Sequence, residues 1–304
     1  MRIIQIDVNK PIKIDRPIVA CIGYFDGLHI GHQALINKTK EISKEKNLET
    51  ALITFDPDPW VTLKGLDNVK HLTTMKQRIN LAVHHGIRNI IILKFTKEMA
   101  NLSFEDFSEK ILGQCNIKNL VCGFDFKYGK NGEGNSLTLK ASGLFDVTII
   151  DSVNFNGEKI STTRIIECLN DGDIELANKL LGYNYEIQGK IIKGNQKGSK
   201  IGFPTANIQS ETEYYLPKNG VYACYLKVLN KKYKAMVNIG HNPTFNFVKN
   251  ISIEAHIIDF NHDIYGCNVS LEFVKFLRDE KKFNNIDNLI LQLEQDLFNT
   301  KRIL

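Results

Sequence analysis

Long apolar runs, paired cysteines and dense basic blocks are all missing from this sequence of 304 residues. No apolar run approaches the ~18 residues that a membrane-spanning helix needs, and no signal-peptide pattern opens the chain, so we expect a soluble cytoplasmic protein without a membrane partner. The six cysteines are scattered without a Cys-x-x-Cys pair, which favours reduced thiols over a disulfide framework or a zinc site. The net charge of +5 suits anionic small molecules as well as nucleic acid. Because no block of Lys and Arg decides for the latter, we expect no nucleic-acid partner.

The chain is long enough for two domains, each with its own core, and it contains no internal repeat or low-complexity segment. In the first half, strand-like segments alternate with helix-like segments, a pattern typical of a parallel, doubly wound α/β sheet. The expected strands are residues 18–22, 50–55, 89–93, 120–122 and 147–150, and the expected helices include 74–85 and 104–112.

The pattern changes near Tyr183, so we predict domains at residues 1–182 and 183–304 with a short connection between them. Strand-like segments with polar turns in the second half favour a small antiparallel β-barrel. The expected strands there are residues 221–229, 233–239, 251–260 and 268–276. One helical stripe near the end predicts a closing helix that packs on the barrel, and its members are Ile286, Leu289, Ile290, Leu293 and Leu297.

The first half is organised around residues 18–36, IVACIGYFDGLHIGHQALI. An apolar strand is followed by a glycine-bearing turn and a helical pattern, and this is where α/β folds present backbone N–H groups to an anion. The turn matches neither the GxGxxG dinucleotide fingerprint nor a Walker A loop, so a different phosphate chemistry is indicated.

His29 and His32 lie three residues apart in this turn, so one helical turn would aim both side chains the same way. Such a pair could begin a metal site, although no Cys or carboxylate stands at ligand spacing beside it. Simple packing or helix capping is a second alternative. Phosphate binding is the interpretation that the surrounding glycines favour.

The segment GYFDGLHIGH resembles the GxFDGxHxGH signature of the bacterial FAD-synthetase branch of the HxGH nucleotidyltransferases. The resemblance implies a Rossmann-like domain in which His29 and His32 stabilise charge on the α-phosphate of ATP as pyrophosphate leaves. Imidazoles suit that role because they are donors that can carry positive charge near neutral pH, and no covalent intermediate is needed. By the same resemblance, the residues of the turn expected to bind the nucleotide are Gly23, Phe25, Asp26, Gly27 and Gly31.

Two loops of the first half are expected to hold the flavin. GFDFKYGKNGEG, residues 123–134, resembles the family's GxDFxFG loop and places Asp125 and Phe126 at its flavin-binding positions. A tight surface loop would satisfy the same glycines. Asp56 follows an expected strand, at the end where open α/β sheets bind ligands, and we assign it to the flavin as well.

The segment ISTTRI, residues 160–165, resembles the family's ISSTRIR. Thr162, Thr163 and Arg164 precede a helical pattern, so hydroxyls, backbone amides and a guanidinium can hold a triphosphate there. A plain helix cap is the alternative. Two positions depart from the family pattern: Ile166 replaces its final Arg, and Asp58 stands where its Pro-His-Pro segment has His.

In the second half, the chemistry is expected in residues 193–208, KGNQKGSKIGFPTANI. Thr205 and Asn207 alternate on an extended segment, so both side chains leave the same face, and their oxygens suit Mg²⁺. GFPTAN resembles the riboflavin-kinase signature, which implies nucleotide contacts for Gly194, Gly202 and Pro204. A solvated basic hairpin remains the alternative for the lysines, which are Lys193, Lys197 and Lys200.

Two later segments, VNIGHNPTFN (residues 237–246) and IEAHIIDF (residues 253–260), match the same kinase family in order and spacing. Glu254 falls at the family's catalytic glutamate. Alternation along the strand also permits a solvent-facing Glu254, because Ser252 and His256 share its face. Ser199 replaces an Arg that is usual in the glycine loop, so no phosphate contact is assigned to it.

These resemblances imply a bifunctional enzyme that phosphorylates riboflavin to FMN in its second half and adenylylates FMN to FAD in its first half. The expected small molecules are ATP, riboflavin and FMN, with Mg²⁺ for each reaction and no obligate protein partner. Two other classes stay open. One is a single-activity enzyme with one regulatory half, and the other is a flavin- or nucleotide-binding protein.

Overall fold

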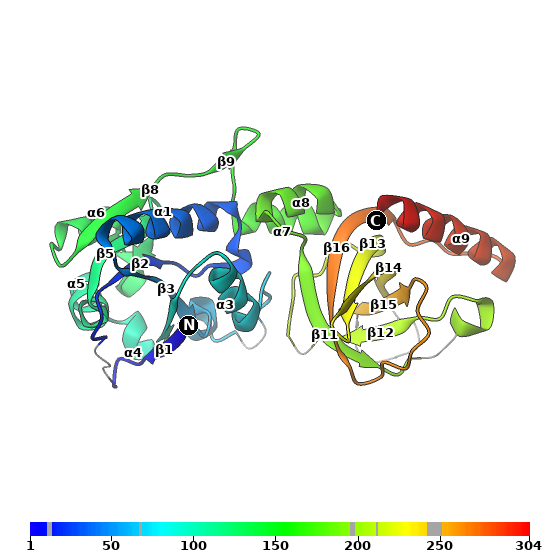
Figure 1. Cartoon of the computed structure of the whole chain (residues 1–304), viewed down its shortest axis with the longest axis horizontal. Helices are drawn as coiled ribbons and strands as arrows, with labels where there is room; N and C mark the ends of the chain where they lie inside the picture. Colours follow the sequence, from blue (N-terminus) through cyan, green and yellow to red (C-terminus); the bar gives the residue numbers. More distant parts are fainter. Residues whose placement is uncertain (11–13, 67–68, 195–197, 211, 242–250) are drawn as a thin grey trace. The chain divides into compact units, whose positions relative to one another are not determined.

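The computed structural model describes residues 1–10, 14–66, 69–194, 198–210, 212–241 and 251–304. The chain forms two compact units, Met1–Thr162 and Thr163–Leu304, and each is described by itself (Figure 1). Among the described residues, no helix combines the length and the apolar character needed to cross a membrane.

The first unit is built on a six-stranded parallel sheet with the order β1-β4-β3-β2-β5-β8. Its strands are β1 (Arg2–Ile6), β2 (Ile18–Ile22), β3 (Glu49–Asp56), β4 (Asn89–Lys94), β5 (Ile117–Gly123) and β8 (Asp146–Ile150). Five of them contain the expected strands, and β1 is an addition that the sequence pattern did not indicate. The order places β2 between β3 and β5, so the turn after β2 lies centrally at the carboxyl edge of the sheet.

Helices cover both faces of this sheet, which confirms the doubly wound prediction. On one face, Leu35 and Ile36 of α1 pack with Val19 and Cys21 of β2. On the other face, alternate strand residues such as Ala20 pack with the segment around Phe107. The helices are α1 (Ile30–Lys46), α2 (Pro59–Lys64), α3 (Met75–His84), α4 (Lys97–Ala100), α5 (Phe104–Asp106) and α6 (Ser136–Ala141), with a π-helical turn at Phe107–Ile111. Two small hairpins complete the unit, β6 (Lys127–Tyr128) with β7 (Gly134–Asn135) and β9 (Asn154–Phe155) with β10 (Glu158–Lys159).

Helix α7 (Thr162–Asp171) starts at the last residue of the first unit, and its remaining residues open the second unit. Helix α8 (Ile174–Leu181) follows, and the chain continues into a closed antiparallel barrel. The barrel order is β11-β12-β15-β14-β13-β16, and the antiparallel barrel itself confirms the sequence prediction. Its strands are β11 (Glu186–Ile192), β12 (Ala206–Gln209), β13 (Gly220–Val228), β14 (Lys231–His241), β15 (Ile251–Ile257) and β16 (Asn268–Arg278). Leu229 and Asn230 both have positive φ angles, and together they make the tight turn that joins β13 to β14.

Helix α9 (Ile286–Ile303) closes the chain on the outside of the barrel. Ile290, Leu293 and Leu297 of its apolar stripe pack against Phe203 and Met236, which confirms the expected closing helix. Phe203 belongs to the GFPTAN segment, so α9 also supports the loop expected to bind the nucleotide.

Candidate functional sites

The glycine turn after β2 has a backbone that few residue types adopt without strain. Phe25 (φ 59°), Gly27 (φ 70°) and Leu28 (φ 36°) all have positive φ angles around the short 3₁₀ turn Asp26–Leu28. The side chains of Phe25 and Leu28 are completely buried, so packing holds the two non-glycine residues in this conformation.

The carboxylate of Asp26 fixes this turn to a distant segment of the same unit. It accepts hydrogen bonds from the backbone N–H groups of Leu72 and Thr73, each at 2.9 Å, and from the Thr73 hydroxyl at 2.9 Å. Arg78 adds a buried cation, with Nη2 at 3.8 Å from Asp26 Oδ1. The side chain of Asp26 therefore positions the loop, and the expected contact between Asp26 and the nucleotide stays a prediction.

His29 and His32 are brought together as the sequence predicts. Their rings stack with centroids 3.7 Å apart, and His29 Nδ1 accepts a hydrogen bond from the backbone N–H of His32 at 3.3 Å, which caps α1. Because Nδ1 is the acceptor, a neutral His29 ring carries its hydrogen on Nε2. Gly31 makes room for this arrangement, since a Cβ atom there would lie 3.0 Å from the His29 ring. The residue that caps α1 is therefore also the first histidine of the expected phosphate-binding pair.

Burial decides the charge of the histidine pair. It lowers the pKa of His29 to about 4, helped by the positive charge of Lys159, and it also lowers the pKa of His32 well below its usual range. Both rings are therefore neutral near neutral pH, so the expectation that they carry positive charge there is wrong, and any contact with a phosphate would be made by a neutral N–H group. Lys159 was not singled out in the sequence, although its place directly before the ISTTRI segment was a usable signal.

The GFDFKYG loop divides its aromatic side chains between the surface and the core. Lys159 forms an ion pair with Asp125 and places its ammonium group 4.9 Å from the centre of the Phe124 ring. Phe126 stacks on Tyr128 at 5.6 Å and packs on the core. Phe124 is 46% exposed, so it is the aromatic side chain of this loop that a ligand could reach without rearrangement.

The other expected residues of the first site lie on two segments. Asp56 is the exposed last residue of β3, at the carboxyl edge of the sheet. Thr162 lies near the turn, with its hydroxyl 3.5 Å from the carbonyl oxygen of Asp26. Thr163 and Arg164 stand in the first turn of α7 and belong to the second unit, so their contact with the triphosphate stays a prediction.

In the second unit, the barrel brings Glu254, Thr205 and Asn207 together. Asn207 on β12 is paired in register with Glu254 on β15, and the Thr205 hydroxyl donates to Glu254 Oε2 at 3.4 Å. On β15, Ile253 and Ala255 are buried while Glu254 is half-buried, so Glu254 lies on the outer face of the barrel wall. Hydroxyl, amide and carboxylate oxygens converge there, a donor set that suits Mg²⁺.

Gly194, at the start of the expected nucleotide-binding segment, lies directly against the side chain of Asn207. A Cβ atom on Gly194 would lie 2.0 Å from Asn207 Nδ2, so a larger residue would push the amide away. Gly202 has a φ of 85°, and the following Pro204 accepts a hydrogen bond at its carbonyl oxygen from His256 Nδ1 at 2.9 Å. Lys197 and residues 242–246 of the VNIGHNPTFN segment lie outside the described residues.

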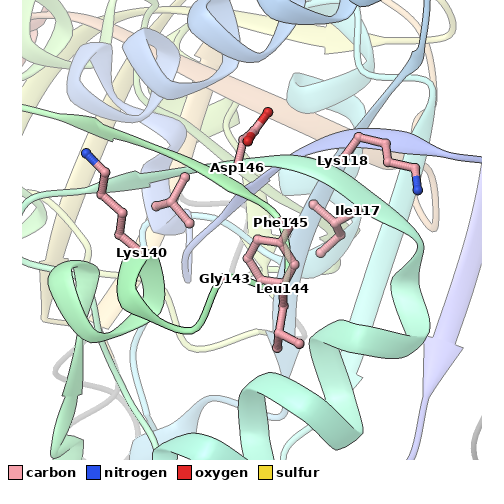
Figure 2. Close-up of a pocket in the computed structure, with 8 residues that line it drawn as sticks. Ile117, Lys118, Lys140, Gly143, Leu144, Phe145 and Asp146 are labelled. Atoms are coloured by element: carbon pink, nitrogen blue, oxygen red, sulfur yellow. The ribbon is translucent and has the colours of Figure 1, made fainter.

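A surface hollow of about 470 Å³ lies elsewhere in the first unit (Figure 2). Lys118, Lys140, Phe145 and Asp146 line it, beside the first residues of β5 and β8. It therefore lies at the amino edge of the parallel sheet, whereas the histidine pair lies at the carboxyl edge. None of the expected site residues lines this hollow.

The two folds and their sites describe a class of enzyme: a nucleotidyltransferase-like α/β unit joined to a closed barrel that carries a cluster of hydroxyl, amide and carboxylate groups. A family model described as FAD synthetase matches residues 12–164, and one described as riboflavin kinase matches residues 181–304. The chain belongs to the family of bifunctional riboflavin kinase/FMN adenylyltransferases.

Relatives support this assignment over most of the chain, and a solved structure shares its fold. A Listeria monocytogenes protein described as a bifunctional riboflavin kinase/FMN adenylyltransferase is 40% identical over 298 residues, covering 97% of this chain and 92% of the relative. A Bacillus subtilis protein of the same description is 38% identical and covers 91% of this chain and 90% of the relative. A crystal structure from Streptococcus pneumoniae, described as a macrolide-efflux protein, matches with a TM-score of 0.91 at 32% identity over 98% of both chains.

The comparisons confirm the predicted family, fold class and pair of activities. The division at Tyr183 and the individual site residues stay predictions. The two family models leave residues 165–180 between them, and these residues lie within the second compact unit.

Proposed function

We propose that the first unit joins AMP from ATP to FMN, giving FAD and pyrophosphate, and that the second transfers the γ-phosphate of ATP to the ribityl 5′-hydroxyl of riboflavin, giving FMN. The observation that supports this proposal is that one chain carries two separate side-chain clusters suited to phosphate chemistry. One is the buried His29–His32 pair on a glycine turn, and the other is the Thr205–Asn207–Glu254 cluster of the barrel.

In adenylyl transfer, negative charge accumulates on the α-phosphate as the acceptor phosphate of FMN attacks. His29 Nε2–H is fixed as a donor by the cap that Nδ1 makes, and the neutral state of the ring means that this donor keeps its hydrogen near neutral pH. The ring sits at the N-terminus of α1, where backbone N–H groups favour an anion. Positioning and charge stabilisation are sufficient, and no covalent enzyme intermediate is required.

In riboflavin phosphorylation, Glu254 orients the ribityl hydroxyl and accepts its proton as the hydroxyl attacks phosphorus. Thr205 and Asn207 would hold Mg²⁺ together with the phosphates and water, and the ion would neutralise charge on the transferred group. Gly194 keeps the glycine loop against the Asn207 amide, which orients the amide for this role.

We place the enzyme in the cytoplasm, with small molecules as its partners. All six cysteines are free, and burial raises the pKa of Cys122 to about 11 and that of Cys21 to about 12. Protonated, buried thiols of this kind suit a reducing compartment.

Incubation with riboflavin, ATP and Mg²⁺, followed by chromatographic separation of the flavins, tests the function. We expect FMN to form first and FAD afterwards, and pyrophosphate to be released when ATP and FMN are supplied together. FMN formation without FAD, or FAD formation from supplied FMN alone, would indicate a single-activity enzyme. Flavin binding without turnover would indicate a binding protein.

A further inference from the structure

Helix α9 exposes two large apolar side chains on the face that turns away from the barrel. Its inner face packs on the barrel through Ile290, Leu293 and Leu297 (Figure 1). On the opposite side, Leu291 is 63% exposed and Phe298 is 60% exposed. These two residues lie seven positions apart, so they share one face of the helix. A single exposed leucine is ordinary on a protein surface, whereas a leucine and a phenylalanine aligned on one helix face indicate a contact surface.

Charged residues continue this face at both ends of the helix. Asp287 lies four residues before Leu291, and both are exposed. Arg302 lies four residues after Phe298, and it is exposed as well. Residues four apart in a helix are neighbours on its surface, so all of these side chains lie on one side of α9. We refer to Asp287, Leu291, Phe298 and Arg302 as the outer stripe.

The outer stripe is complementary to itself when a second copy is turned around. It is acidic in the first turn of the helix and basic in the last. A parallel neighbour would bring Asp287 against Asp287 and Arg302 against Arg302, and like charges repel. An antiparallel neighbour brings Asp287 of each copy to Arg302 of the other, in a contact with two-fold symmetry. The same charges suit the helix dipole, but the dipole does not account for an exposed leucine and phenylalanine between them.

One register of the antiparallel pair satisfies the apolar and the charged residues together. The two-fold axis then passes between Glu294 and Gln295, and Leu291 of each copy faces Phe298 of the other. The charged ends of the outer stripe meet at both ends of the contact. At its centre, the amide of Gln295 faces the carboxylate of Glu294 and can donate to it. An axis at Leu291 or at Phe298 would pair that residue with itself and leave the other without an apolar partner.

We propose that the outer stripe is a dimerisation surface, on which a second copy of this chain packs its own α9 in the antiparallel direction. The stripe is about 22 Å long at 1.5 Å per residue, so the contact is one helix face against another. Such an area is at the low end of specific protein interfaces, and the dimer is therefore weak and reversible. We expect a dissociation constant on the order of 10–100 μM. The proposal depends on neither of the two activities.

The first test measures the mass of the full-length chain against its concentration. Sedimentation velocity over roughly 1–500 μM should show the average mass rising from 34.6 kDa towards twice that value. Phe298→Glu places a carboxylate in the apolar contact and should weaken association at least about tenfold. Ile286→Ala is the matched control, because Ile286 is 56% exposed on the same helix but lies about a third of a turn away from the outer stripe. It should leave association unchanged.

The second test reverses the charges at the ends of the outer stripe. Asp287→Arg and Arg302→Asp each bring like charges together at both ends of the contact, so each should weaken association several-fold at low salt. The double variant Asp287→Arg/Arg302→Asp pairs opposite charges again and should recover the association that each single variant loses. Circular dichroism and the melting temperature, measured on every variant, report whether the fold is intact.

Three outcomes would overturn the proposal. A wild-type chain that stays monomeric at the highest concentration would mean that the outer stripe meets another partner or only water. A dimer that persists in folded Phe298→Glu would mean that the copies meet through a different surface. A folded double charge variant that associates no better than the single variants would exclude the antiparallel register and the proposal with it.

Discussion

The two candidate sites are assembled in opposite ways. In the α/β unit, several packed segments enclose the turn that carries the histidine pair, and His29 and the Asp26–Arg78 pair are buried. In the barrel, Asn207 and Glu254 face each other across two neighbouring strands on a half-exposed wall. The first site therefore depends on tertiary packing and exclusion of water, whereas the second depends on strand register.

This difference has consequences for the chemistry of each site. Burial keeps the His29 ring neutral, so the donor that we propose is prepared before substrate binds. The barrel site has its oxygens near water, which suits an ion that keeps several water ligands. Substitutions in the first site should therefore affect folding and catalysis together, and substitutions in the second should affect mainly catalysis.

The largest effect is expected from removing both histidines. His29→Ala/His32→Ala loses two donors to the α-phosphate, each of which contributes on the order of 10²–10³ in rate. FAD formation should fall below detection while FMN continues to accumulate from riboflavin, as measured by chromatography of the flavins. Unchanged FAD output would remove the histidine pair from the mechanism and with it the contrast between the two sites.

Glu254→Gln should have the opposite effect on the two activities: FMN formation should slow, and FAD synthesis should be retained. The substitution keeps size and hydrogen bonding but removes the basic oxygen, so riboflavin phosphorylation should slow by roughly 10²–10⁴. FAD synthesis from supplied FMN should continue at the wild-type rate, and the melting temperature should hardly change. Thr205→Ala is the companion variant and should raise KM for Mg-ATP instead. Near-normal FMN production by Glu254→Gln would show that the Glu254 carboxylate only faces solvent and does not act as the base.

A pair of fragments examines where the barrel unit begins. Residues 183–304 form the predicted kinase domain, but α8 packs on β16, where Asn178 donates to the carbonyl oxygen of Phe273 at 2.9 Å. We expect both 183–304 and 163–304 to phosphorylate riboflavin. The longer fragment should be more stable by roughly 4 kcal/mol or more in urea denaturation, because three large aliphatic side chains of α8 are buried at ~1.5 kcal/mol or more each. These side chains are Ile174, Leu180 and Leu181. Equal stabilities would mean that α8 contributes nothing to the barrel.

The periodicity of the sequence was sufficient for most of the fold. Buried apolar runs marked five of the six parallel strands, and alternation on β15 placed Glu254 on the face opposite Ile253 and Ala255. β1 was missed because RIIQI is a short, mostly exposed edge strand that lacks a buried pattern.

The site was predictable where a motif is contiguous and unpredictable where it depends on distant partners. The three-residue spacing was enough to predict that His29 and His32 meet, although His29 reaches His32 as the extended cap of α1 and not from within the helix. The Asp26 carboxylate accepts hydrogen bonds from the backbone N–H groups of Leu72 and Thr73, which lie 46 and 47 residues further along the chain. No local sequence pattern reveals contacts of this kind. The neutral state of the histidines depends likewise on burial, which is a property of the assembled fold.

The smallest effect concerns the pH dependence of stability. In the unfolded chain His29 binds a proton below its ordinary pKa of 6.5, whereas in the folded chain burial delays protonation to a pKa of about 4. The unfolded state therefore gains protons first as the pH falls. The stabilisation is complete above pH 6.5 and is lost progressively as the pH falls towards 4, by roughly 3 kcal/mol for the whole shift.

Urea denaturation of the full chain can measure this loss for the α/β unit specifically, because the one tryptophan, Trp60, lies in α2 of that unit and reports on its unfolding by fluorescence. His29→Asn is the matched control, since asparagine can still cap α1 but cannot titrate. The carboxylates that also titrate in this range are the same in both proteins, so their contribution cancels in the difference. Between pH 6.5 and 4, the free energy of unfolding should fall more for the wild type than for His29→Asn. If the difference between the two free energies stayed constant across that range, the His29 imidazole would be protonated as easily in the folded chain as in the unfolded one.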